Sequence, residues 1–305
     1  MKLTVATCQF PISADIRSNL RFVLAQMREA RARRAHVAHF PEACLSGYAG
    51  IDFESHAGFD WRLLEDSARQ VLERAKSLGL WVVLGSAHRL TARHKPHNSL
   101  YIIDSNGRIA DRYDKRFCSG DRGGKTGDLA HYSPGNHLSV FTINGVRCGA
   151  LICYDFRYPE LYRAYRRERV QLLFHSFHAG GLSASRYLEM KRYVSARFAK
   201  LSGGATIPAV TMPATVQAAA ASNYMWISCP NSSAPESCWP GFMVRPDGVV
   251  VGRLERNKHD ILLTTVDTSE ELYDSTAAWR GRAMSGVLHS GALVRDPRSS
   301  RRKRL

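Results

Sequence analysis

Residues 145–163 read GVRCGALICYDFRYPELYR and contain a hydrophobic strand that stops abruptly at Cys153. Pro159 then predicts a helix, because proline is tolerated in a first helical turn, where its missing N–H would have no partner. The strand end places Cys153 in a cleft beside the backbone N–H of Tyr154. A thiolate and a negatively charged oxygen could both be stabilised there. Since a cysteine at a strand end is more often a small core residue, further signals are needed.

Two other strand ends carry side chains that suit the same chemistry. Residues 36–40 alternate as a strand that a proline ends, which leaves Glu42 at the strand exit. Residues 109–121, IADRYDKRFCSGD, predict another strand with Lys115 at its end. Glu42 could take the proton of the Cys153 thiol and return it to a leaving amine, and Lys115 could hold the charge of a tetrahedral intermediate. Any one of the three alone would be an ordinary surface or core residue.

The chain resembles the carbon–nitrogen hydrolase, or nitrilase, superfamily in three motifs: FPE at 40–42, YDKRF at 113–117 and CYDFRYPELYR at 153–163. The resemblance continues through SPGN at 133–136, FHAG at 177–180 and VRPDG at 244–248, and covers roughly residues 2–267. It implies that Glu42, Lys115 and Cys153 are the catalytic residues and that the Tyr154 N–H stabilises the oxyanion. It also implies an α/β fold, a four-layer α-β-β-α sandwich, that forms a homodimer or a higher homo-oligomer.

One position departs from the superfamily's pattern. Many members carry a second Glu six residues before the Pro of the PG turn, and this chain has Asp128 six residues before Pro134. Aspartate keeps the charge but is one methylene shorter, which affects its reach to Lys115. Asp128 is therefore either a fourth catalytic residue or a residue of the glycine-rich loop around it.

The substrate is expected to contact side chains that flank these motifs: Tyr48, Phe117, Arg157, His178 and Trp239. His178 follows the predicted strand at 171–177, whose exit should border the same cleft. The basic composition favours a substrate that carries a carboxylate, with Arg157 or Arg186 as its clamp.

Several reactions fit these residues. True nitrilases of the superfamily typically place Trp-Glu after the cysteine, whereas this chain has Tyr154-Asp155, as its amidases and carbamoyl-amide hydrolases commonly do. We therefore expect hydrolysis of a small linear amide or an N-carbamoyl compound, without a metal or an organic cofactor. The alternatives are a nitrilase or acyltransferase of the same fold, or a weakly active or non-catalytic basic protein that binds nucleic acid or an acidic partner.

Composition limits the class of protein. The 305 residues are 44% hydrophobic and 23% charged, which is typical of a globular protein. The formal net charge is +16, but the Arg residues are spread over helical stretches, so a nucleic-acid partner is not expected. Seven Cys without a C-x-x-C pair argue against disulfides and a zinc site. No apolar run approaches the ~20 residues that span a bilayer, and no leader is evident, so we expect a cytoplasmic protein.

The chain divides into a predicted carbon–nitrogen hydrolase domain at 1–269 and a C-terminal extension at 270–305 that ends in a basic tail. Alternating strands and helices with inserted hairpins predict two mixed sheets with helices outside. Within 181–214 we predict a helix over 183–201, and a further helix that starts only near 215. The long connection between them would be a lid, a binding loop or a subunit contact.

Overall fold

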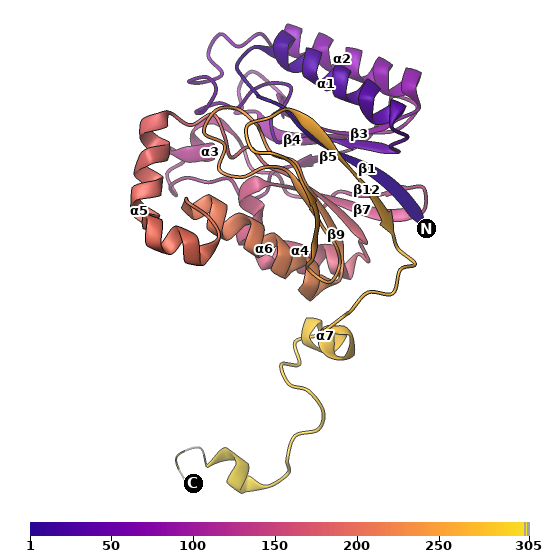
Figure 1. The fold of residues 1–305 in the computed structure, drawn as a ribbon, viewed down its shortest axis with the longest axis vertical. Helices are drawn as coiled ribbons and strands as arrows, with labels where there is room; N and C mark the ends of the chain where they lie inside the picture. The colour runs from indigo at the N-terminus through magenta and orange to yellow at the C-terminus, as the bar shows by residue number, and fades with distance from the viewer. Residues whose placement is uncertain (302, 304–305) are drawn as a thin grey trace.

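Two six-stranded sheets pack face to face with helices on their outer faces (Figure 1). The computed structural model describes residues 1–301 and 303. The first sheet has the order β12-β1-β2-β3-β4-β5, with β1 (Lys2–Gln9), β2 (Val37–His39), β3 (Trp81–His88), β4 (His97–Ile103), β5 (Ile109–Asp114) and β12 (Asp260–Asp267). The second has the order β11-β10-β9-β8-β7-β6, with β6 (Val140–Ile143), β7 (Val146–Ile152), β8 (Leu172–Ser176), β9 (Trp226–Cys229), β10 (Phe242–Val244) and β11 (Val250–Arg253).

The outer layers are helical, as predicted. The α-helices are α1 (Ile16–Ala32), α2 (Trp61–Leu78), α3 (Gly127–His131), α4 (Pro159–Arg167), α5 (Ala184–Ser202), α6 (Ile207–Asn223) and α7 (Ala277–Met284), with 3-10 turns η1 (Cys153–Arg157) and η2 (Pro297–Ser300). Helices α1 and α2 cover the first sheet, and α4 and α6 cover the second (Figure 1). The structure therefore confirms the four-layer sandwich.

The directions of the strands determine at which edge of the sandwich the three predicted catalytic residues lie. Strands β1, β2 and β3 run parallel in one sheet, and β7, β8 and β9 run parallel in the other. The carboxyl ends of parallel strands share one edge of a sheet, where α/β folds place their sites. Glu42 follows β2, Cys153 follows β7, and Lys115 follows the antiparallel strand β5.

The space between the sheets is mostly apolar but contains a hydrogen-bonded cluster of polar side chains around His39. His39 of the first sheet hydrogen-bonds Ser228 at 2.8 Å and Ser176 at 2.9 Å, both on the second sheet. Thr7 joins Ser228 at 2.8 Å, and Ser176 donates to the Phe40 carbonyl at 2.8 Å. Burial lowers the pKa of His39 well below its ordinary value, so its ring is neutral. These bonds fix how β2, which leads to Glu42, lies against the other sheet.

The helix boundaries in 181–214 correct one prediction. Helix α6 begins at Ile207 rather than near residue 215, so the α5–α6 connection is only residues 203–206. Thr206 caps α6 by accepting a hydrogen bond from the Ala209 N–H at 3.2 Å, and Pro208 lies in the first turn, where proline is tolerated. Pro213 lies inside α6, where a proline normally argues against a helix.

The C-terminal segment leaves the sandwich after β12 (Figure 1). Helix α7 is held through Arg280, which donates to the Asp274 carboxylate at 2.9 Å and lies over the Tyr224 ring. Leu288, at 87% exposed, is typical of the residues that follow. The boundary at 269/270 stays a prediction, and positions 302, 304 and 305 of the basic tail lie outside the described residues. In the part of the chain that the structure describes, no helix is long and apolar enough to cross a bilayer.

Candidate active site

The turn after β7 holds Cys153 in an unusual conformation. Cys153 has φ = 37°, a left-handed value that costs a non-glycine residue about 1–3 kcal/mol. Asp155 fixes the turn, since one carboxylate oxygen accepts from the Ile152 N–H at 3.0 Å and from the Tyr113 hydroxyl at 2.8 Å. Its other oxygen accepts from the Phe117 N–H at 2.8 Å. Asp155 thus ties the cysteine turn to the end of β5. Burial raises the pKa of Asp155 to about 6.

His175 supports the same turn from β8. Its Nε2 lies 3.3 Å from the Cys153 carbonyl oxygen, and its Nδ1 lies 3.1 Å from the Tyr162 hydroxyl. Burial lowers the pKa of His175 to about 3, so the ring is neutral. Nε2–H therefore donates to the Cys153 carbonyl, and the Tyr162 hydroxyl donates to Nδ1.

Glu42 is fully buried and oriented by neighbours on several strands. Its Oε1 accepts from Asn98 Nδ2 at 2.8 Å and from Lys115 Nζ at 2.8 Å. Its Oε2 has no hydrogen-bond partner among the described residues. The turn before it passes very close to β3: a Cβ on Gly85 would lie 2.1 Å from the Pro41 carbonyl oxygen, so only glycine fits there.

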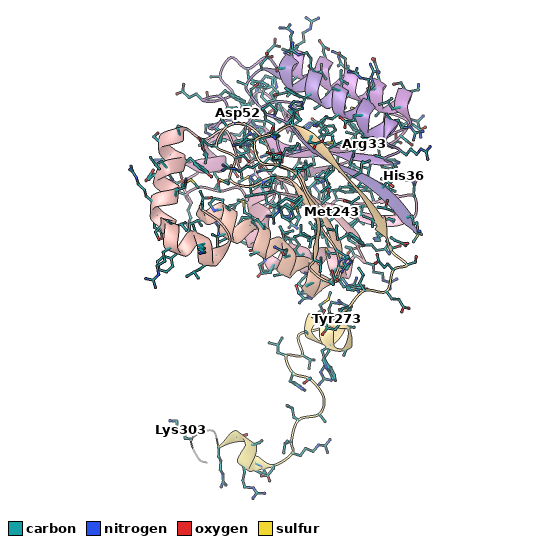
Figure 2. All side chains as sticks on the ribbon, viewed as in Figure 1. Arg33, His36, Asp52, Met243, Tyr273 and Lys303 are labelled. Atoms are coloured by element: carbon teal, nitrogen blue, oxygen red, sulfur yellow. The ribbon has the colours of Figure 1, made fainter. Side chains whose placement is uncertain are left out.

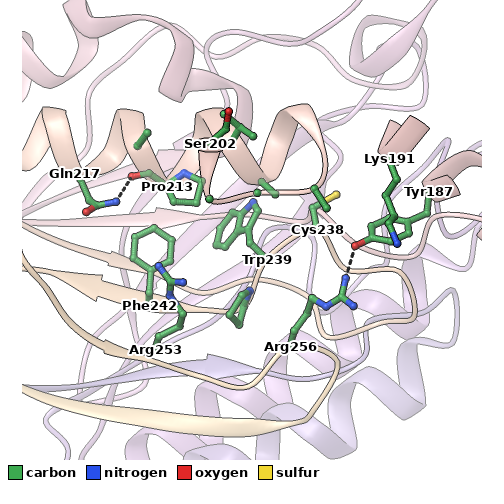
Figure 3. Close-up of a pocket in the computed structure, with 17 residues that line it drawn as sticks. Tyr187, Lys191, Ser202, Pro213, Gln217, Cys238, Trp239, Phe242, Arg253 and Arg256 are labelled. Atoms are coloured by element: carbon green, nitrogen blue, oxygen red, sulfur yellow. Dashed lines mark hydrogen bonds between the residues drawn. The ribbon is translucent and has the colours of Figure 1, made fainter. Parts of the chain in front are cut away.

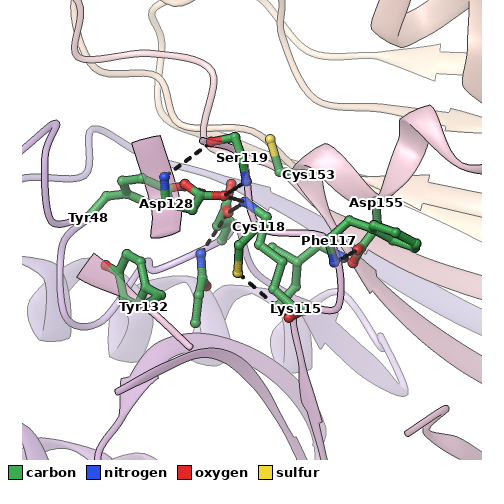
Figure 4. Close-up of polar contacts among 12 residues, drawn as sticks. Tyr48, Lys115, Phe117, Cys118, Ser119, Asp128, Tyr132, Cys153 and Asp155 are labelled. Atoms are coloured by element: carbon green, nitrogen blue, oxygen red, sulfur yellow. Dashed lines mark hydrogen bonds and ion pairs between the residues drawn. The ribbon is translucent and has the colours of Figure 1, made fainter. Parts of the chain in front are cut away.

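Lys115 is the centre of the charged cluster (Figure 4). Its Nζ lies 2.8 Å from Glu42, 2.7 Å from Asp128 and 3.3 Å from the Tyr48 hydroxyl, and the side chain is 1% exposed. Burial alone would lower the pKa of Lys115, but Glu42, Tyr48 and Asp128 together raise it well above its usual value. The amine is therefore a cation at neutral pH.

Asp128 reaches Lys115 despite its shorter side chain. It lies in the first turn of α3, where the Ser119 N–H donates to Oδ2 at 3.0 Å and the Tyr48 hydroxyl donates to Oδ1. Burial would raise the pKa of Asp128, but Lys115 and these donors lower it below its ordinary value. The structure thus places Asp128 with Lys115 and Glu42.

Cys153 is partly exposed beside this cluster. Burial raises the pKa of its thiol well above the ordinary value, and the nearby Glu42 carboxylate raises it further. The resting sulfur is therefore a thiol, and Glu42 is the neighbouring group that can accept its proton.

The residues predicted to contact substrate are not all in one place. Tyr48 belongs to the Lys115 cluster, and the ring of His178 lies 5.4 Å from that of Tyr48. Phe117 stacks on Tyr158 at 3.5 Å near the Cys153 turn. Trp239 instead lines a separate cavity, as described below.

Neither predicted arginine clamp is held against the cluster. Arg157 is exposed, and its guanidinium lies over the Phe156 ring at 4.9 Å. Arg186 is exposed on α5 and pairs with Glu189 at 2.6 Å.

Sequence reasoning missed two residues of the site. Asn98, at the start of β4, orients Glu42 through a hydrogen bond. The only feature of the sequence that could have indicated this role is a polar residue at the start of a buried strand. Asp52 accepts from His178 Nε2 at 3.1 Å and from the Tyr48 N–H at 2.8 Å, and it lies in an irregular loop that gave no signal. Among the described residues, no group of three or more His, Cys, Asp or Glu could hold a metal ion.

Comparison with known proteins decides the family. Residues 4–272 match the carbon–nitrogen hydrolase family. The chain belongs to this family.

Several curated proteins that are named as amidases match part of the chain. The chain is 30% identical to a 2-oxoglutaramate amidase of Bacillus subtilis, over 57% of this chain and 64% of the relative. It is 31% identical to a deaminated glutathione amidase of Yersinia enterocolitica, over 55% and 60%. In both cases the match spans less than two thirds of the relative's length.

A solved structure shows the same fold over nearly the whole chain. It is a variant of the amidase from Nesterenkonia sp. AN1, with a TM-score of 0.70 at 17% identity, over 94% of this chain and 97% of that one. That structure carries the acetamide moiety of fluoroacetamide, added covalently at its active-site cysteine.

Proposed function

We propose that this protein hydrolyses the carboxamide bond of a small linear amide through a thioester on Cys153. The main support for the proposal is that the Lys115 ammonium pairs with two buried carboxylates, Glu42 and Asp128, beside the Cys153 turn. Family membership and the relatives named as amidases support it.

The free oxygen of Glu42 begins the reaction. Oε2 takes the Cys153 proton as Sγ attacks the amide carbon, and the C=O electron pair moves onto oxygen. Lys115 Nζ and the Tyr154 N–H stabilise this oxyanion. When the C–N bond breaks, Glu42 returns the proton to nitrogen, and ammonia leaves.

Water completes the cycle. Glu42 removes a proton from a water molecule as the water oxygen attacks the thioester carbon. The C–S bond then breaks, the acid is released, and Glu42 returns the proton to Sγ. Lys115 keeps its charge throughout, because Asp128 still stabilises the ammonium while Glu42 carries the transferred proton.

We further propose that the preferred amide carries a carboxylate at its far end. The basic balance of the chain favours an anionic substrate, and 2-oxoglutaramate, in the name of one relative, is such a compound.

The test measures ammonia release from matched compounds. Glutaramate and pentanamide have the same chain length and differ in the terminal carboxylate, and an N-carbamoyl compound and a nitrile complete the set. We expect kcat/KM to be about tenfold or more higher for glutaramate than for pentanamide, as one charge-assisted contact provides. Equal values would contradict the carboxylate preference alone, whereas a preference for the nitrile or the N-carbamoyl compound would contradict the amidase proposal.

A further inference from the structure

A cavity of about 520 Å³ is lined in part by Trp239 (Figure 3). It is lined by residues of α5, the 203–206 connection, α6 and the segments around β10 and β11. Its floor is apolar and buried, with Trp239 at 4% and Phe242 at 1% exposed. Val210 and Pro213 of α6 form one wall. The residues that line it do not include Glu42, Lys115 or Cys153.

Three cationic side chains line this cavity: Lys191, Arg253 and Arg256 (Figure 3). The guanidinium of Arg256 and the ammonium of Lys191 lie 5.5 Å and 5.9 Å from the centre of the Tyr187 ring, so both charges are on the same side of the cavity. Arg256 also donates to the Ser237 carbonyl at 3.1 Å. Within residues 1–301 and 303, none of the three cations forms an ion pair.

The surrounding carboxylates of the described residues form no ion pair with these three cations. No Asp or Glu is among the residues that line the cavity. Glu189 of α5 pairs with Arg186 at 2.6 Å, and Glu255 pairs with Lys258 at 2.8 Å. Glu236 lies near Cys238 but forms no ion pair within the described part of the chain. The cavity therefore combines an apolar floor with a positively charged rim.

We propose that this cavity binds a carboxylate with an apolar body, at a site separate from Cys153. The carboxylate would lie beside Arg256 and Lys191, near the Tyr187 ring, since a planar guanidinium group matches carboxylate geometry, and Arg253 would add to the positive charge of the rim. The apolar body would pack on Trp239 and Phe242, as apolar walls with a few placed polar groups are typical of small-molecule sites. This inference does not depend on the reaction proposed for Cys153.

The test is isothermal titration of the whole protein with 4-phenylbutyrate, compared with 4-phenylbutan-1-ol, which has the same apolar body without the charge. We expect the carboxylate to bind at least about tenfold more tightly than the alcohol. Arg253→Gln and Lys191→Gln should each weaken carboxylate binding about threefold, because rim charges are partly screened. Arg62→Gln should leave binding unchanged, since Arg62 is an exposed α2 residue outside the cavity.

Two further variants separate this site from the other. Ala214→Trp fills the cavity from an exposed position of α6 and should abolish carboxylate binding without changing charge. Cys153→Ala should bind the carboxylate as the wild type does. The inference is wrong if no carboxylate binding is measured, if the alcohol binds equally well, if the Gln and Trp variants bind normally, or if Cys153→Ala abolishes binding.

Discussion

At the scale of single residues, the cluster is organised by one buried ammonium held by two buried carboxylates. Separating Lys115 from these carboxylates would cost several kcal/mol of free energy, because it would leave an unpaired charge in the interior. Glu42 accepts hydrogen bonds from Lys115 and Asn98 at Oε1, and its Oε2 has no partner among the described residues. The arrangement therefore fixes the direction in which Glu42 can accept a proton.

Asp128→Asn tests the second carboxylate. The variant keeps the shape of the side chain but removes the charge 2.7 Å from Lys115 Nζ. Because Glu42 would then be the one carboxylate left beside the ammonium, we expect kcat/KM for glutaramate to fall roughly 10- to 100-fold. Asp121→Asn changes an exposed aspartate of the same loop and should keep wild-type activity. Full activity in Asp128→Asn would show that Asp128 is only a loop residue.

At the scale of elements, neutral buried histidines hold the sheets and the cysteine turn together, which predicts acid sensitivity. The pKa of His175 is about 3 in the folded protein and near 6.5 when exposed. The unfolded chain therefore binds more protons between these values, and stability falls as pH drops below 6.5. At pH 5 this histidine alone should cost about 2 kcal/mol of unfolding free energy.

His175→Gln isolates this effect. Glutamine can still donate to the Cys153 carbonyl but does not titrate. Urea unfolding at pH 7 and pH 5 should show a loss of stability about 2 kcal/mol smaller in the variant than in the wild type. His94→Gln, at an exposed loop position, is the control and should match the wild type. An identical loss in His175→Gln would mean that His175 is not buried as a neutral ring.

Helix α5 contains one residue with a strained backbone conformation. Ser195 has φ = 64° and ψ = 155° inside α5, a region that only glycine adopts readily. Ser195→Gly should therefore stabilise the protein by about 1 kcal/mol in urea unfolding. Ala196→Gly, at the next and regularly helical position, should destabilise it by about 1 kcal/mol. Destabilisation by both changes would argue for an unbroken α5.

The sequence predicted the residues of the candidate site better than it predicted the helix boundaries within 181–214. Glu42, Lys115 and Cys153 could be located because each lies just after a predicted strand and within a motif that resembles the carbon–nitrogen hydrolase family. Asp128 could be located only by counting from the PG turn, and its reach depends on the fold of a glycine-rich loop. The start of α6 was missed because Pro208 and Pro213 look like breakers, although the Thr206 cap and tertiary packing outweigh them. Asp52 has no local pattern at all.

At the scale of the whole molecule, the C-terminal segment contributes unequally to stability. Tyr224 bonds the Leu272 backbone in both directions at 3.2 Å, and Arg280 covers its ring, whereas Leu293 and Val294 are 67% and 72% exposed. Removing residues 287–305 should change Tm by less than about 2 °C. Removing residues 270–305 uncovers Tyr224 and should lower Tm by roughly 5 °C. Differential scanning calorimetry of both truncations checks this, and equal shifts would contradict it.

The whole sandwich brings the ends of β2, β5 and β7 to one edge, which is what places Cys153 beside Glu42 and Lys115. The most direct test is intact-mass analysis of protein quenched in acid during turnover of glutaramate, with ammonia measured in parallel. We expect a species heavier by the acyl group, located on the peptide that contains Cys153, and loss of both this species and ammonia release in Cys153→Ala. Continued ammonia release by Cys153→Ala, or an acyl group on another residue, would contradict it.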